Sequence, residues 1–220
     1  MDIDVTSLHH RRAVNRWERV SVGDIAERLV WSYPDQEALI GRPGCYAAPE
    51  FERLTYRQVN ELTAQLANGL LAAGLHRGDR VLLYGENSVE AFLAKLAIAR
   101  AGLVCVPINP TLAPDVLAYL ISTTEPRFAI VEAGLWERAR QPFQAHRLRP
   151  GITIPLGGDP VPGSVSFADF VATQPLDEPD VEIHGDDIWQ ILFTSGTTAL
   201  HKGAMISHNA SYFAAYNFAL

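Results

Sequence analysis

An alternation of helical and strand patterns between residues 55 and 131 constrains the fold of this chain more than any other feature. Thr55 and Gln58 have the spacing of a helix-capping box, and apolar side chains follow at helical intervals as far as Gly74. Helices are also expected from Ser88 to Gly102 and from Pro114 onward. Between the helices lie short, uniformly apolar strands, at 80–84, 103–107 and 127–131. Because the strands are apolar on both faces and the connections are short, the pattern predicts an α/β fold, a largely parallel sheet with helices on both faces.

The segments before this alternation are less regular. Residues 1–20 are expected to form a lead-in segment. Ser21 is expected to cap a helix over residues 22–31, whose apolar side carries Ile25, Leu29 and Val30. Residues 36–54 hold short apolar pieces broken by glycine and proline, which predicts a strand pair with a loop between its strands.

Beyond residue 131 the pattern weakens. It predicts a helix within 132–149 with its arginines outside, a strand at 152–156 and a short helix at 167–171. The stretch 177–187 then gathers acidic side chains, in a spacing that does not match a calcium loop. We expect this stretch to be a solvated connector.

Composition excludes several classes of protein. The chain has 220 residues, a net charge of -7 and a pI near 5.5, which argues against nucleic-acid binding because such proteins need a basic surface. No uncharged apolar run reaches the ~18 residues of a membrane span. The two cysteines, Cys45 and Cys105, lie far apart and in no metal-ligand spacing. We therefore expect a globular protein of a reducing, cytoplasmic compartment.

The segment from residue 188 to residue 207 carries the chemistry. It reads as a strand, a small polar loop, a second strand and the cap of a closing helix. The glycine lets a phosphate come close to the backbone amides, four hydroxyls add small donors, and a lysine adds positive charge. These candidate phosphate ligands are Thr194, Ser195, Gly196, Thr197, Thr198 and Lys202. The alternative is a polar hairpin loop with a solvated lysine.

The same segment differs from other nucleotide motifs. Six positions separate Gly196 from Gly203, and no Gly-Lys-Ser/Thr triplet is present, so the loop is not a Walker A motif. The sequence also lacks a dinucleotide fingerprint and a Gly-x-Ser-x-Gly elbow. Its histidines show no metal-ligand spacing. We expect structural and not catalytic roles for the remaining notable residues. Lys95 and His201 are expected to be solvated and Trp189 to anchor the core. His208 and Asn209 are expected to cap and begin the last helix.

A resemblance to a known family follows from these residues. The run 191–198, with Lys202-Gly203 and Ser207-His208-Asn209, resembles the signature phosphate loop of the adenylate-forming superfamily. Earlier landmarks of that superfamily occur in the right order, at 54–56, 78–81, 87–88 and 101–110. The chain thus resembles the amino-terminal part of an AMP-forming acyl-CoA synthetase from about residue 21 to residue 220.

The resemblance implies a two-step reaction. A carboxylate attacks the α-phosphate of ATP to give an acyl-adenylate and pyrophosphate, and coenzyme A then displaces AMP. The resemblance also implies that Thr194, Ser195, Gly196, Thr197, Thr198 and Lys202 contact the outer phosphates, with Mg²⁺ sharing their charge. The catalytic residues are expected beyond Leu220, because the carboxyl-terminal half and lid domain of the family are absent. The chain is therefore expected to be a truncated part of an adenylation domain, incomplete as a catalyst on its own.

Two positions depart from the family pattern. Ala199 stands where the family generally has glycine, and His201 where it generally has proline. An alanine forced to positive φ would add about 1 kcal/mol of strain. We expect a fatty acid as the substrate of the longer enzyme. The alternatives are an amino-acid or aryl-acid adenylating domain, or a non-catalytic nucleotide-binding or interaction remnant, and the sequence leaves the oligomeric state open.

Overall fold

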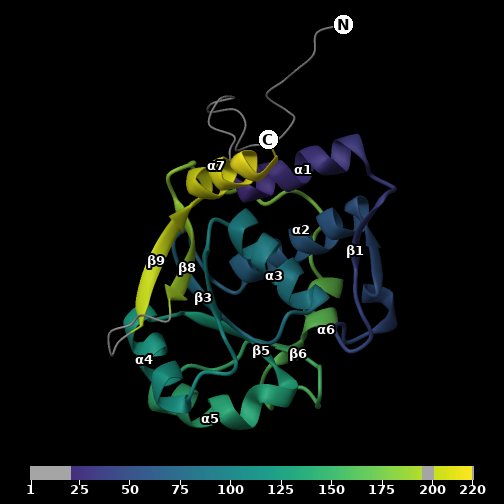
Figure 1. Cartoon of the computed structure of the whole chain (residues 1–220). Helices are drawn as coiled ribbons and strands as arrows, with labels where there is room; N and C mark the ends of the chain where they lie inside the picture. Colours follow the sequence, from purple (N-terminus) through teal and green to yellow (C-terminus); the bar gives the residue numbers. More distant parts are fainter. Residues whose placement is uncertain (1–20, 195–200, 220) are drawn as a thin grey trace, which may run out of the picture.

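The computed structural model describes residues 21–194 and 201–219 (Figure 1). The predicted lead-in, residues 1–20, lies outside the described residues. The strands are β1 (Glu37–Ile40), β2 (Arg53–Thr55), β3 (Arg80–Tyr84), β4 (Val104–Ile108), β5 (Phe128–Glu132), β6 (Ile152–Ile154), β7 (Val165–Ser166), β8 (Ile188–Thr194) and β9 (Lys202–Ser207). The α-helices are α1 (Val22–Ser32), α2 (Tyr56–Ala72), α3 (Val89–Arg100), α4 (Pro114–Thr124), α5 (Trp136–Ala145), α6 (Phe167–Ala172) and α7 (His208–Ala219). Short 3-10 turns occur at η2 (Pro49–Phe51) and η3 (Ala133–Leu135).

The main sheet has seven strands in the order β7-β6-β5-β3-β4-β8-β9. All neighbouring strands run parallel except β8 and β9, which form an antiparallel hairpin at one edge. The sequence prediction of a largely parallel α/β sheet is therefore confirmed. The predicted strand pair within residues 36–54 is the separate antiparallel pair β1–β2.

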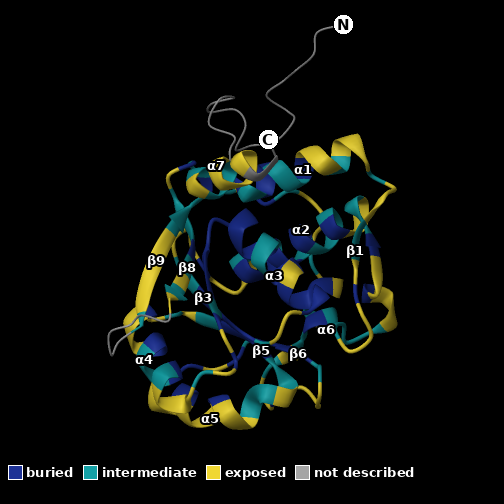
Figure 2. Ribbon diagram, viewed as in Figure 1, coloured by how far each residue is buried: buried dark blue, intermediate teal, exposed yellow. Residues whose placement is uncertain are grey.

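Helices cover the sheet on both faces. Successive side chains of each strand point to opposite sides, so the central strands β3, β4 and β5 contribute to two cores. Val81 and Leu83 of β3 belong to the core that α2, α3 and α6 close. Leu82 and Tyr84 belong to the core that α4 and α5 close. Figure 2 shows the buried residues gathered along the central strands and the inner sides of these helices. The strands had to be apolar on both faces because each face meets a helical layer.

The helix starts follow the capping signals of the sequence. Thr55 Oγ1 accepts a hydrogen bond from Gln58 N at 3.3 Å, and the Gln58 side chain accepts one from Thr55 N at 2.8 Å. Ser88 Oγ accepts from Ala91 N at 3.1 Å and so caps α3. Both caps satisfy amides that the first helical turn leaves without a backbone partner.

Ile25, Leu29 and Val30 share one apolar side of α1, as expected, but this side is only partly covered. Leu29, which we placed on the apolar side of α1, is 39 % exposed, while Asp24 and Glu27 are buried. Asp24 is buried because it completes the capping box with Ser21, whose Oγ donates to its carboxylate at 2.7 Å. The apolar side of α1 instead borders a partly open groove beside α3 and α7.

The acidic connector before β8 is solvated only in part. Asp177, Asp180, Glu182 and Asp186 are exposed as expected, whereas Glu178 and Asp187 pair with arginines. Glu178 forms an ion pair with Arg100 of α3, and both side chains are almost fully buried. Asp187 accepts two hydrogen bonds from the Arg77 guanidinium, at 2.7 and 2.9 Å. The carboxylates of Glu178 and Asp187 lie against the protein because their arginine partners belong to α3 and to the turn before β3.

Candidate functional site: a cleft at the carboxyl edge of the sheet

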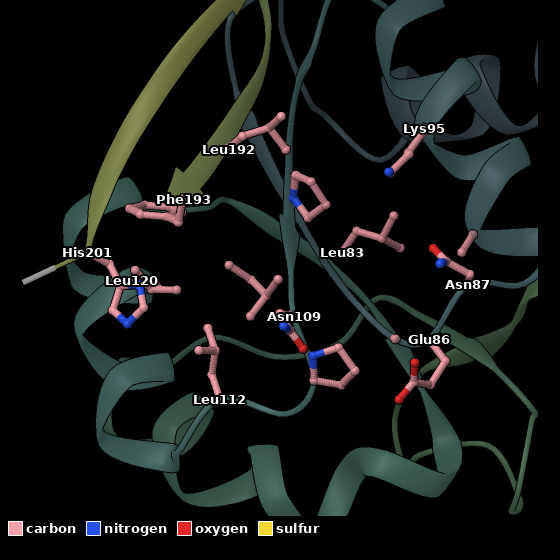
Figure 3. A pocket seen from close by; sticks show the side chains of 15 residues that line it. Leu83, Glu86, Asn87, Lys95, Asn109, Leu112, Leu120, Leu192, Phe193 and His201 are labelled. Carbon is pink, nitrogen blue, oxygen red and sulfur yellow. The ribbon is translucent and has the colours of Figure 1, made fainter. Parts of the chain in front are cut away.

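A cleft of about 530 Å³ opens beyond the carboxyl ends of β3 and β4 (Figure 3). Its floor is made by residues of these strands and its far wall by the end of β8. Open parallel sheets bind ligands at this edge, where the turns after neighbouring strands meet. The cleft is therefore the place where the fold favours a ligand.

The turns after β3 and β4 are held by side-chain hydrogen bonds. Glu132 at the end of β5 accepts from Glu86 N at 2.7 Å, which fixes the turn after β3. Burial raises the pKa of Glu132, although the bond from Glu86 N acts in the opposite direction. After β4, Asn109 Oδ1 accepts from the amide and the hydroxyl of Thr111, at 2.9 and 2.8 Å. The cleft thus has a preformed polar rim.

The β8–β9 hairpin brings the two ends of the expected phosphate loop together. Thr194 and Lys202 face each other as a registered pair, and both are exposed. Phe193, next to Thr194, and His201, next to Lys202, line the cleft (Figure 3). The loop therefore begins and ends at the cleft. Ser195, Gly196, Thr197 and Thr198, together with Ala199, lie outside the described residues, so the expectation for them stays a prediction.

His201 differs from the solvated residue that we expected. It is half-buried, and its Nδ1 lies 3.1 Å from the carbonyl oxygen of Thr194. The Tyr119 hydroxyl donates to the His201 carbonyl oxygen at 3.5 Å. The imidazole therefore joins the two strands at the base of the loop and contributes to the cleft wall.

Lys95 also differs from the sequence prediction, which placed it in solvent. It is half-buried on α3, and its side chain points toward the cleft (Figure 3). Asn87, Ala91 and Lys95 are four residues apart and all line the cleft, so helical spacing places Lys95 on the cleft side of α3 once the position of the cleft is known. Lys95 adds a cationic group to a site where sequence reasoning had counted only Lys202.

The residues after the hairpin anchor the last helix. Ser207 Oγ accepts from Ala210 N at 3.2 Å, so the predicted cap of α7 is confirmed. His208 is buried, and its Nδ1 accepts from Val22 N of α1 at 3.0 Å. Trp189 is half-buried rather than a deep core residue, and its indole donates to Ser211 Oγ at 2.8 Å. These contacts tie the end of the hairpin to the first described helix.

Within residues 21–194 and 201–219, no three His, Cys, Asp or Glu side chains lie close enough to hold a metal ion. No helix in the same ranges has the length and apolar character to cross a membrane.

Comparison with known proteins defines the class. A family model described as "AMP-binding enzyme" matches residues 27–219, and the chain belongs to this family. One curated relative is the long-chain-fatty-acid–CoA ligase FadD13 of Mycobacterium tuberculosis, 33% identical over 195 residues. Another is the 3-hydroxybenzoate–CoA/4-hydroxybenzoate–CoA ligase of Thauera aromatica, 30% identical over 181 residues. The match covers 88% of this chain and 37% of the first relative, and 79% and 35% for the second.

A solved structure agrees with the fold. The anthranilate CoA ligase AuaEII, determined in complex with anthranoyl-AMP, superposes with a TM-score of 0.75 at 26% identity. The match covers 86% of this chain and 35% of that chain. The chain spans little more than a third of the length of these relatives. The resemblance to the amino-terminal part of such an enzyme is therefore confirmed.

Proposed function

We propose that this chain supplies the ATP phosphate-binding part of an AMP-forming acid–CoA ligase. The observation that carries the proposal is the registered pair Thr194 and Lys202, which holds both ends of a hydroxyl-rich loop at the carboxyl edge of a parallel sheet. In this proposal Thr194, Ser195, Gly196, Thr197, Thr198 and Lys202 contact the β- and γ-phosphates of MgATP. Membership of the AMP-binding enzyme family supports it.

The proposed reaction consumes ATP, a carboxylic acid and coenzyme A. A carboxylate oxygen of the acid bonds to the α-phosphorus, and the bond from that phosphorus to the oxygen bridging to the β-phosphate breaks. Pyrophosphate leaves, and the thiolate of coenzyme A then attacks the acyl carbon and releases AMP. The role of this chain is to stabilise negative charge on the departing pyrophosphate with amides, hydroxyls and one ammonium group.

The proposed acid is a fatty acid. The relative of 33% identity is a long-chain-fatty-acid–CoA ligase, which supports this choice. An aryl acid is the second candidate, supported by the hydroxybenzoate–CoA ligase and by the anthranilate CoA ligase structure. Both candidates share the same use of ATP and differ only in the acyl group.

A pyrophosphate-exchange assay tests the proposal. The assay uses a polypeptide that contains this chain and spans the full length of its relatives, with a panel of fatty and aryl acids. We expect exchange of labelled pyrophosphate into ATP with a fatty acid, and a loss of at least tenfold in Lys202→Ala. The matched control is Arg140→Gln, which removes an exposed charge of α5 away from the cleft. Exchange with no acid at all, or undiminished exchange in Lys202→Ala, would rule out the proposed role.

A further inference from the structure

A second pocket, of about 650 Å³, lies between the carboxyl ends of α4 and α5. It is lined by residues 121, 122 and 125–127, where α4 leads into β5, and by residues 146–149, which lead from α5 toward β6. The two helices pack against each other (Figure 1). Because β5 and β6 are parallel to β3 and β4, this pocket lies at the opposite edge of the sheet from the cleft, and the two share no lining residue.

The pocket concentrates positive charge in a chain whose net charge is -7. Three arginines line it, with His146 beside them and Glu125 as the acidic residue of the lining; the arginines are Arg127, Arg147 and Arg149. Arg127 lies 3.3 Å from the Asp79 carboxylate. The side chains of Arg147 and Arg149 are exposed and have no hydrogen-bond or ion-pair partner within the described part of the chain.

These arginines are not needed to complete the helix ends. The end of α4 is satisfied by Arg80, which donates to the carbonyl oxygens of Thr124 and Glu125 at 2.8 and 3.0 Å. The end of α5 is closed by the backbone itself. Arg147 N donates to Gln144 O at 3.1 Å, and Leu148 N donates to Phe143 O at 3.0 Å. The guanidinium groups of Arg147 and Arg149 are therefore left available, while that of Arg127 is exposed but shared with the Asp79 carboxylate.

The backbone at this pocket is unusual. Glu125 with a φ of 44° and Arg147 with a φ of 53° are the non-glycine residues of positive φ in the described ranges, and both line the pocket. Elsewhere the chain uses glycine for this conformation, as at Gly74 after α2 and Gly102 after α3. A charged side chain kept where glycine fits without strain indicates a role for that side chain.

We propose that this pocket binds a phosphate-bearing anion through the guanidinium groups of Arg127, Arg147 and Arg149. A planar guanidinium group pairs with two phosphate oxygens at once, and three such groups around one pocket match a ligand with more than one negative charge. The site is separate from the proposed ATP site. The same phosphate chemistry is offered by a soluble polyphosphate and by the headgroup of an anionic lipid.

Calorimetric titration with tripolyphosphate at constant ionic strength tests the proposal. The full chain carries Lys202→Ala, so that the hairpin loop does not contribute. Arg147→Gly and Arg149→Gln are then added singly, and Arg140→Gln is the matched control outside the pocket. A parallel arm measures sedimentation with phosphatidylcholine vesicles, with and without phosphatidic acid. Constant ionic strength separates a bound anion from general screening.

We expect one bound tripolyphosphate, at least a tenfold loss of affinity in Arg147→Gly and in Arg149→Gln, and no loss in Arg140→Gln. We also expect Arg147→Gly to melt no lower than its parent, because glycine relieves the positive φ. Sedimentation only with phosphatidic acid, lost in Arg147→Gly, would assign the phosphate to a lipid. Absence of binding in both arms would overturn the proposal. So would binding that both pocket variants retain.

Discussion

Arg100 of α3 and Glu178 of the connector form an ion pair whose side chains are only 4% and 7% exposed. The Arg100 guanidinium also donates to the Asn60 carbonyl oxygen and to Thr63 Oγ1 of α2, both at 2.8 Å. One guanidinium thus joins two helices to the segment that leads into β8. The connector that leads to the hairpin is thereby fixed to the helical layer, while the hairpin itself joins the sheet through the pairing of β8 with β4.

Removing one partner of the pair should be strongly destabilising. Glu178→Ala leaves the Arg100 charge buried and unpaired, so we expect the free energy of unfolding to fall by about 3–5 kcal/mol. Urea denaturation measures the change. Asp177→Ala, at an exposed neighbouring position, should cost less than about 0.5 kcal/mol. Equal and small effects of the two substitutions would contradict a structural role for the pair.

The stability should depend on pH through Glu90. Its side chain is fully buried, Oε1 accepts from Ala47 N at 2.6 Å, and Oε2 has no hydrogen-bond partner. Burial raises its pKa above the ordinary value of 4.5. The folded state therefore holds this proton to a higher pH than the unfolded state, and stability is lost as the pH rises from about 4.5 through the folded pKa.

The variant Glu90→Gln cannot ionise and keeps an acceptor for Ala47 N. As the pH rises from about 4 to about 7, the unsubstituted protein should lose stability through Glu90 and the variant should not. We therefore expect the free energy of unfolding of Glu90→Gln to increase relative to that of the unsubstituted protein. Denaturant titrations of both proteins across this range give the comparison. A difference that does not change with pH would show that Glu90 has the same pKa in the folded and unfolded states.

The two cysteines should differ in reactivity. Cys105 is buried in β4, and burial raises the pKa of its thiol to about 12, against the opposing charge of Lys95. Cys45 is half-buried. Because the thiolate is the reactive form, Ellman's reagent should modify Cys45 alone in the native protein and both thiols after unfolding. In Cys45→Ser, a native thiol that still reacts rapidly would contradict the burial of Cys105.

The cap of α3 should contribute measurably to stability. Ser88→Ala removes the acceptor of Ala91 N next to the cleft, and we expect a loss of about 1 kcal/mol in the free energy of unfolding. Ser32→Ala, at the exposed end of α1, is the control with a smaller expected effect. A Ser88 effect no larger than that of Ser32 would mean that α3 does not depend on its cap.

The sequence predicted the layers and the sheet because their signals are local. Caps such as Thr55 and Ser88, stops such as Gly74 and Gly102, and strands apolar on both faces appear directly in the order of residues. The strand β7 was missed because two residues are too few to show a period. The types of the elements and the largely parallel topology could therefore be predicted from the sequence.

The surroundings of charged residues were predicted less well. Glu178 and Arg100 are 78 residues apart, and no local pattern relates them. Lys95 looked solvated because its helix position alone does not show that the cleft lies beside it. The basic pocket between α4 and α5 likewise joins two segments that are distant in the chain. Tertiary contacts decide these environments, so they appear only in the folded structure.

The most direct test of the proposed function is calorimetric titration of the chain with MgATP, with and without Lys202→Ala. Both proteins carry Arg147→Gly, so that the basic pocket does not contribute to binding. Lys202 is exposed, so its removal should leave the fold unchanged. We expect measurable binding that weakens at least tenfold when the Lys202 ammonium group is removed. Equal affinity in the two proteins would contradict the assignment of this hairpin to the phosphates of ATP.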